Sequence, residues 1–333
     1  MKNKFNYYIT KYFTEYLPNT KGVSKNTILS YRDTFMYLLE FLEKEKKKNI
    51  NCIDLEDISL EIIEEFLDYL EKERKNSART RNQRLASIHS FYHFIQKREL
   101  SCYDICSRIL EIPFKKFSKN TISYFSVDEI EILINSPNSS TRNGFRDYVL
   151  LLYMYETASR VQEICDLTVK QLVLNDNNSS VIINGKGNKN RRIPISGNLA
   201  IILKRYINTF ELKETDYVFQ NQQKKQLTRK GIEYILLKYI TKTKGKYSDK
   251  FKQHYSNHSM RHSRAMHLLE SGVNIIYIRD FLGHEHVTTT EEYVKANPTV
   301  KEQQIRKYSK ELNAEERYTE EDKNTLLSFL KEL

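Results

Sequence analysis

The segment from residue 258 to residue 293 reads HSMRHSRAMHLLESGVNIIYIRDFLGHEHVTTTEEY. If residues 258–270 form a helix, His258 and Arg261 lie three residues apart and share one face. His284 and Tyr293 follow after an apolar-patterned stretch. One arginine, or one tyrosine among 23, carries no signal alone. The ordered set, however, can supply a phosphate clamp, proton-transfer groups and an oxygen nucleophile.

A second polar motif lies upstream. Arg160 follows an apolar helix predicted over residues 147–155, and Glu163 comes three residues later. At that spacing on a helix, a carboxylate can hold a guanidinium in one rotamer. An ordinary surface ion pair has the same spacing, so the pair alone leaves both interpretations open.

A lysine lies between these two motifs in a predicted hairpin. Residues 181–183 and 191–195 are strand-like runs on either side of the loop NGKGNKN at 184–190. Apolar runs joined by a glycine-containing loop predict a β-hairpin. Lys186 would lie at its exposed tip, where a lysine is usually only solvated. It can also deliver an ammonium group to a DNA groove or to a leaving oxygen.

The first 100 residues predict helices with few breakers. We expect one helix over 4–17 that stops at Pro18, a long one capped by Ser24, one after Ser59, and one from about 77 to 98. The beginning of the last helix is basic, with Arg74, Lys75, Arg79, Arg81 and Arg84. Guanidinium groups suit phosphate contact, although a basic helix face is more commonly just solvated.

The weakly periodic stretch 100–122 predicts a linker, and it carries the basic residues Lys115 and Lys116. A capping-box pattern at Ser126 and Glu129 then predicts the first helix of a second domain. We therefore divide the chain into a helical domain, a linker, a second domain and a tail helix, at 1–112, 113–122, 123–310 and 311–333. The tail places Leu326, Phe329, Leu330 and Leu333 on one apolar face, which either folds back or docks on a neighbouring molecule.

Composition limits the class of protein. The chain has 333 residues and a net charge of +11, which favours a polyanionic partner such as nucleic acid. A lysine surplus from an AT-biased coding sequence also explains part of that charge. The four cysteines form no zinc-binding pattern, and the longest apolar run, 148–155, is too short to span a bilayer. We expect a cytoplasmic protein with no membrane partner.

Taken together, these motifs resemble those of the tyrosine recombinase (phage integrase) family, including its Xer-type members. The matching boxes, in family order, are TASRVQE at 157–163, GKGNK at 185–189 with RIP at 192–194, HSMRH at 258–262, LGH at 282–284, and TT at 289–290 followed by Tyr293. The chain departs from the family pattern at Ala158-Ser159, where Gly-Leu is common, and at Met260, where Leu is common.

The resemblance implies a mainly α fold with a small β-sheet or hairpin in the second domain. Residues 1–112 would form a helical, SAM-like core-binding domain, and residues 123–310 a mixed α+β catalytic domain. The function implied is that of a site-specific DNA recombinase, or integrase, which we expect to serve a mobile genetic element. An Xer-like recombinase for chromosome or plasmid resolution and a catalytically inactive DNA-binding relative are the alternatives.

The resemblance also implies residue roles. Tyr293 would attack the scissile phosphate and form a covalent 3′-phosphotyrosine, while Arg160, Arg261 and His284 would bind the phosphate oxygens. His258 would accept the tyrosine proton, Lys186 would protonate the leaving oxygen, and Glu163 would orient the arginine site. We interpret His262 and His286 as structural. The candidates for DNA binding are Arg74, Lys75, Arg79, Arg81, Arg84, Lys115, Lys116, Lys189 and Arg191.

The partners implied are double-stranded DNA and further copies of the chain. Strand exchange between two recombination sites would require a homotetramer, with a monomer or dimer away from DNA. The tail helix is a candidate for exchange between protomers, and whether it acts within its own chain or on a neighbour stays open. The mechanism implied needs no metal and no other cofactor, because two guanidinium groups supply the positive charge.

Overall fold

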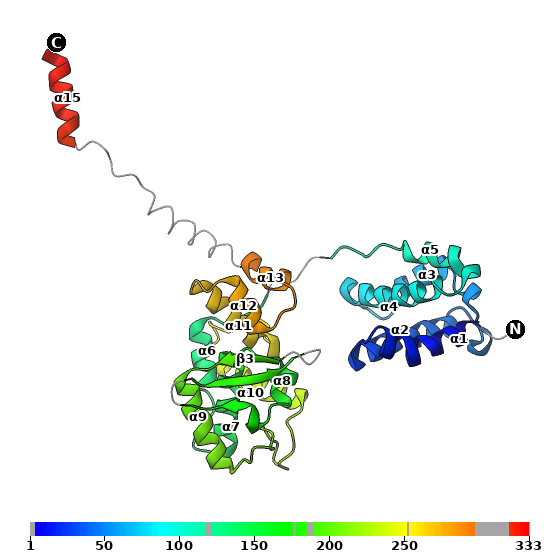
Figure 1. Cartoon of the computed structure of the whole chain (residues 1–333), viewed down its shortest axis with the longest axis horizontal. Coiled ribbons are helices and arrows are strands. Elements are labelled where there is room, and N and C mark those ends of the chain that lie inside the picture. The colour runs from blue at the N-terminus through cyan, green and yellow to red at the C-terminus, as the bar shows by residue number, and fades with distance from the viewer. Residues whose placement is uncertain are drawn as a thin grey trace. The chain divides into compact units, whose positions relative to one another are not determined.

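The computed structural model describes residues 4–117, 122–175, 178–185, 190–251, 253–296 and 320–332. The chain divides into two compact units, Met1–Lys119 and Asn120–Leu333 (Figure 1). The division falls inside the predicted linker at 113–122, and each unit has its own buried core.

The first unit is helical. Its elements are α1 (Lys4–Lys11), the π-helix η1 (Tyr12–Thr20), α2 (Lys25–Lys44), the short 3₁₀ turns η2 (Ile50–Cys52) and η3 (Leu55–Asp57), α3 (Leu60–Lys72), α4 (Ala78–Gln96), the 3₁₀ turn η4 (Leu100–Cys102) and α5 (Tyr103–Leu110). The hydroxyls of Ser24, Ser59 and Ser77 each accept a hydrogen bond from the backbone three residues on, so the helix starts predicted there are confirmed.

Two expectations about this unit were wrong. The first helical segment does not stop at Pro18, because η1 carries the chain through the proline as a wider π turn. Tyr12, at the start of that π-helix, and Leu17, next to the proline, are fully buried, so tertiary packing outweighs the breaker. The stretch 100–122 also contains α5, whose Cys106 and Ile109 are buried in the core. Eight residues are too few to show a clear helical period in sequence.

The second unit combines helices with one small sheet. Its helical elements are α6 (Val127–Ile134), α7 (Arg142–Thr157), α8 (Val161–Cys165), the 3₁₀ turn η5 (Val169–Gln171), α9 (Gly197–Phe210), α10 (Arg229–Lys246), α11 (Asn257–Glu270), α12 (Ile275–Leu282), α13 (Thr288–Ala296) and α15 (Glu320–Glu332). The capping box at Ser126 and Glu129 is present at the start of α6. The fold class predicted from the sequence, mainly α with a small β-sheet in the second domain, is confirmed.

The sheet contains the predicted hairpin. Strands β1 (Leu172–Val173), β2 (Ser180–Asn184) and β3 (Asn190–Pro194) are antiparallel in the order β1-β2-β3. Val181 pairs with Ile193 and Ile183 with Arg191, which confirms the hairpin. The sequence analysis did not predict β1, which has only two residues.

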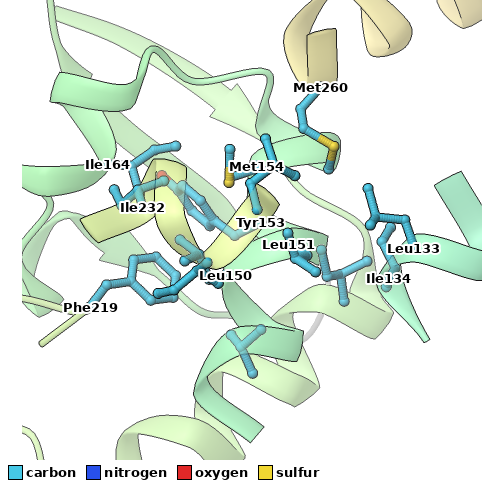
Figure 2. Close-up of a cluster of buried hydrophobic side chains, with 14 of the residues drawn as sticks. Leu133, Ile134, Leu150, Leu151, Tyr153, Met154, Ile164, Phe219, Ile232 and Met260 are labelled. Atoms are coloured by element: carbon cyan, nitrogen blue, oxygen red, sulfur yellow. The ribbon is translucent and has the colours of Figure 1, made fainter. Parts of the chain in front are cut away.

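One core anchors the elements that carry the candidate site. Figure 2 shows Ile164 of α8 and Met260 of α11 in the same buried cluster as Tyr153 and Met154 of α7. Because a close-packed interior resists movement of its parts, the backbones that carry Arg160 and Arg261 are held at fixed positions.

Candidate active site

Arg160 and Glu163 form a local unit at the start of α8. Ala158 ends α7 in the left-handed conformation, with φ of 46°, and turns the chain into Arg160. The Arg160 backbone N–H donates to Glu163 Oε2 at 2.7 Å, and Arg160 Nη1 donates to Glu163 Oε1 at 3.0 Å. The carboxylate therefore fixes both the backbone and the side chain of Arg160.

Arg191 of β3 binds the same carboxylate from the other side. Its Nη1 and Nη2 atoms donate to Glu163 Oε1 and Oε2 at 2.8 and 2.7 Å. Burial opposes ionisation of Glu163, but the hydrogen bonds and charge of Arg191, followed by those of Arg160, lower its pKa. Two guanidinium groups thus share one carboxylate, and a net positive charge remains beside Arg160 for an anion.

The turn after α12 supplies carbonyl oxygens to both predicted clamp arginines. Arg160 Nη2 donates to Gly283 O at 3.0 Å. Arg261 Nη2 donates to Leu282 O and its Nη1 to Ala158 O, both at 2.6 Å. The two guanidiniums, 101 residues apart in the chain, therefore meet at one turn.

Gly283 is required at this turn for two reasons. Its φ is +64°, and a Cβ atom there would lie 3.0 Å from both Cδ and Nη1 of Arg191. A residue with a side chain would be strained by the left-handed backbone and would also contact Arg191 too closely. The glycine of the LGH motif thus lets the turn approach the arginines closely.

Arg261 is a buried cation. Its exposed fraction is 5%, and burial, followed by the charge of Arg160, lowers its pKa to about 9. Among the residues that the structure describes, its hydrogen bonds go to carbonyl oxygens and no carboxylate forms an ion pair with it. Burying a charge without a counter-charge costs free energy, and an anion bound beside Arg261 would reduce that cost.

Tyr293 of α13 packs beside the arginines. It is 4% exposed, in a small apolar cluster with Ala158, Met266 and Ile278. Burial raises its pKa, and the charges of Arg261 and Arg160 oppose that rise. The phenol therefore lies within the electrostatic reach of both guanidiniums.

Two histidines flank the tyrosine ring. The Tyr293 hydroxyl is 2.9 Å from His262 Nδ1. The ring of His284 is nearly parallel to that of Tyr293, with 6.5 Å between centroids. His284 Nδ1 is 3.0 Å from the hydroxyl oxygen of the buried Thr290.

The contact with His262 was missed by the sequence analysis, which interpreted that residue as structural. A signal was available, because His262 follows His258 by one helical turn and therefore lies on the same side of α11. The rings of the two histidines are 6.1 Å apart. The residue His258 as a whole is exposed, but partial burial of its imidazole, followed by the charges of Arg261 and Arg160, lowers its pKa.

The predicted DNA-binding residues have varied surroundings. Lys186 and Lys189 lie outside the described residues. Arg191 is bound to Glu163, as described above. In the first unit, Lys75, Arg79 and Lys116 are exposed.

Other basic residues of the first unit hold its tertiary structure. Arg84 donates to Ser30 O at 3.0 Å. The guanidinium groups of Arg84 and Arg74 both lie over the ring of Tyr37, and Arg74 also forms an ion pair with Glu40. Two further hydrogen bonds of this unit lie on its surface. Arg81 donates to Pro113 O at 3.3 Å, and Lys115 donates to Glu71 at 3.0 Å. The role of all these residues towards DNA stays a prediction.

Two features are absent from the residues that the structure describes. No group of three or more His, Cys, Asp or Glu side chains there could hold a metal ion. No helix in those residues is long and apolar enough to cross a membrane.

Comparison with known proteins identifies the family. The phage integrase family model matches residues 123–299, and the model of the phage integrase N-terminal SAM-like domain matches residues 10–99. The chain belongs to the phage integrase family. It is therefore a tyrosine recombinase, an enzyme of the class that cleaves and rejoins DNA strands.

Named relatives of this tyrosine recombinase cover almost its whole length. A putative integrase/recombinase of Sinorhizobium fredii, y4rC, is 31% identical over 325 residues, which is 98% of this chain and 97% of the relative. The tyrosine recombinase XerD of Staphylococcus epidermidis is 31% identical over 304 residues, 90% of this chain and 96% of the relative.

Solved structures show the same fold. The XerH site-specific recombinase, bound to a palindromic difH substrate after cleavage, has a TM-score of 0.65 at 20% identity and covers 84% of this chain and 78% of its own. The Tn1549 transposon integrase, in complex with transposon right end DNA, has a TM-score of 0.69 at 16% identity, with 91% and 98% covered.

Proposed function

We propose that this tyrosine recombinase is a site-specific DNA recombinase that forms a covalent 3′-phosphotyrosine through Tyr293. The observation that carries the proposal is the convergence of Tyr293, Arg160 and Arg261, which come from α13, the start of α8 and α11. The phenol would attack the scissile phosphate, and the bond to the 5′ oxygen would break. The phosphotyrosine conserves the energy of that bond, so that a strand's 5′-hydroxyl can later reverse the step.

The arginine pair would stabilise the charge that develops on the phosphate oxygens. Preorganised donors in a site with little water contribute most to this kind of catalysis. Arg261 is held by two carbonyl oxygens, and Arg160 by Glu163 and Gly283 O. We assign His284, beside Tyr293, to a further phosphate oxygen.

The leaving 5′ oxygen needs a proton, and we assign that role to Lys186. It belongs to the loop between β2 and β3 and lies outside the described residues. The support comes from the base of the hairpin, where Arg191 of β3 binds Glu163 beside Arg160. The strand that follows the loop is thus tied directly to the arginine site.

Double-stranded DNA is the partner that we propose. The chain has a net charge of +11, and the XerH and Tn1549 proteins are each solved in complex with DNA. We propose a homotetramer on two DNA sites. Leu327, Phe329 and Leu330 of α15 are more than half exposed, so this helix presents apolar side chains that a neighbouring protomer can cover.

For the domain organisation, we propose a core-binding domain over 1–112, a linker over 113–122, a catalytic domain over 123–310 and a tail over 311–333. For the biological role, we propose integration of a mobile element. Resolution of chromosomes or plasmids by an Xer-like enzyme is the alternative, and both a putative integrase/recombinase and a XerD tyrosine recombinase match the chain along most of its length. Mapping the DNA ends that become linked to the protein in cells separates the two roles.

The test of the activity is a nicked suicide substrate followed by a denaturing gel. Loss of the short 5′ fragment prevents religation, so a tyrosine-linked adduct accumulates. We expect an adduct with the intact protein and none with Tyr293→Phe. The matched control is Tyr277→Phe, because Tyr277 is 69% exposed on α12 and should leave the adduct intact. An adduct that survives Tyr293→Phe would refute the assignment.

A further inference from the structure

We infer that His262 is a catalytic residue that accepts the proton of Tyr293, and that His258 faces the phosphate instead. This inference rests on the proposed function, and it moves a role that the sequence analysis gave to His258. The side chain that contacts the reacting oxygen in the structure is that of His262, whose Nδ1 lies 2.9 Å from the Tyr293 hydroxyl.

The geometry suits proton transfer. The distance between His262 Nδ1 and the Tyr293 oxygen lies within the range required of a general base and its proton. The two rings are inclined at 58° with 5.6 Å between centroids, so they meet through the hydroxyl and do not stack. His262 belongs to α11, and Met260, two residues before it on the same helix, is buried in the core.

His262 is also in the protonation state that a base needs. Burial, followed by the charges of His258 and Arg261, lowers its pKa to about 4. The imidazole is therefore neutral near pH 7, with one nitrogen able to accept a proton. A phosphate bound beside Arg261 would favour the imidazolium that forms, because it places negative charge near the ring.

His258 has a different environment, although it lies only one turn away on the same helix. The structure gives its ring a contact with the His262 ring and no hydrogen bond to Tyr293 among the described residues. The positive charges that act on it are those of Arg261, Arg160 and Arg229. A partly exposed imidazole among three guanidiniums is placed to meet an anion.

The proposed step moves one proton to His262 and one to the leaving oxygen. The Tyr293 oxygen forms a bond to phosphorus while its proton passes to His262 Nδ1. The bond from phosphorus to the 5′ oxygen breaks, and that oxygen takes a proton from a separate acid, assigned above to Lys186. On rejoining, the 5′-hydroxyl bonds to phosphorus and gives its proton back to Lys186, while the protonated His262 returns its proton to the tyrosine as the phosphotyrosine bond breaks.

The experiment compares two suicide substrates in single-turnover cleavage. One has the natural 5′ oxygen at the scissile bond, and the other has a bridging sulfur at that position. A thiolate leaves without being protonated, because its conjugate acid is far stronger than an alcohol. The sulfur substrate therefore rescues loss of the general acid but not loss of the general base.

We expect His262→Ala to slow cleavage by about 10²- to 10⁴-fold on both substrates, with DNA affinity unchanged. His262→Asn fills a similar volume and can still hydrogen-bond to the tyrosine, and it should show the same loss. If the alanine variant does not fold, His262→Asn alone tests the loss of the base. Lys186→Ala is the comparison, since its loss should be rescued by sulfur.

Three results would overturn the inference. The first is cleavage by His262→Ala at the rate of the unmodified protein, and the second is recovery of the His262→Ala cleavage rate on the sulfur substrate. The third is normal cleavage by His262→Asn, which would make His262 a positioning residue. A loss in His258→Ala that neither substrate rescues, with His262→Ala unaffected, would return the role to His258. If the unmodified protein forms no adduct on its own site, the proposed function fails, whereas an adduct with unaffected His262 variants rejects only this inference.

Discussion

The two sides of the candidate site are held in different ways. On the arginine side, Arg160, Arg191 and Arg261 each make at least two hydrogen bonds, to one shared carboxylate or to carbonyls of tightly packed turns. On the tyrosine side, the hydroxyl of Tyr293 and the ring of His284 have one hydrogen bond each among the described contacts.

This difference separates a preformed part of the site from an adjustable one. Groups that stabilise charge act best when they are already oriented, because reorientation during the reaction costs free energy. A nucleophile must instead change partners, since its oxygen leaves a histidine and bonds to phosphorus. Apart from His262, which we infer takes part in the proton transfer, we therefore expect substitutions on the arginine side to have larger effects on cleavage than those at the supporting contacts of the tyrosine side, such as Thr290 to His284.

The largest effect should follow loss of the buried cation. Arg261→Ala removes a phosphate ligand together with its bonds to Ala158 O and Leu282 O. We expect cleavage to fall by about 10³-fold or more in single-turnover assays. Much of the DNA affinity should remain, because many other phosphate contacts hold the duplex. Arg160→Ala should behave alike, and loss of most binding at moderate salt in either variant would contradict this.

The second effect concerns the turn that joins the arginines. Gly283→Ala places a Cβ atom against Arg191 on a backbone with φ of +64°. We expect unfolding free energy to fall by about 1–2 kcal/mol and cleavage to fall with it. Gly22→Ala is a matched control, since Gly22 has φ of +59° with nothing within 4 Å of a Cβ atom. The control should lose similar stability in a urea titration and keep its cleavage rate. Equal cleavage by both variants would show that the contact between the new Cβ atom and Arg191 does not cause the loss of cleavage.

The third effect tests whether Arg191 acts through Glu163 or through DNA. Arg191→Ala should slow cleavage with little change in DNA affinity, and its effect should be smaller in a Glu163→Gln background. The expected coupling is about 0.5–3 kcal/mol. Arg192→Ala is the control on the same strand, because that side chain donates to the Ser180 hydroxyl instead. A uniform loss of DNA affinity with additive effects on cleavage would make Arg191 a phosphate contact.

The smallest effect should come from the tyrosine side. Thr290→Val removes the hydroxyl that contacts His284 Nδ1 and keeps the shape of a buried side chain. The loss of one hydrogen bond of this kind corresponds to about 1 kcal/mol, or roughly fivefold in cleavage rate. A loss as large as that of Arg261→Ala would show that the tyrosine side is as tightly preformed as the arginine side.

Local features were predicted well from the sequence. The caps at Ser24, Ser59 and Ser126 depend on a hydrogen bond to the backbone only three residues away, so the neighbouring residues are enough to predict them. The β2–β3 hairpin follows from two short runs joined by a glycine-containing loop. The π turn through Pro18 was not predictable in this way, because the burial that holds it involves helices far along the chain.

By itself, the sequence determined the order of the motifs, the helix starts and the chemical groups available to the site. Only the tertiary structure decided which of these groups meet. Arg191 reaches Glu163 across 28 residues, His262 reaches Tyr293 across 31, and Arg160 reaches Gly283 across 123. The physical reason is that side-chain partners across such separations depend on how the helices pack, whereas caps and hairpins depend on atoms close together in the chain.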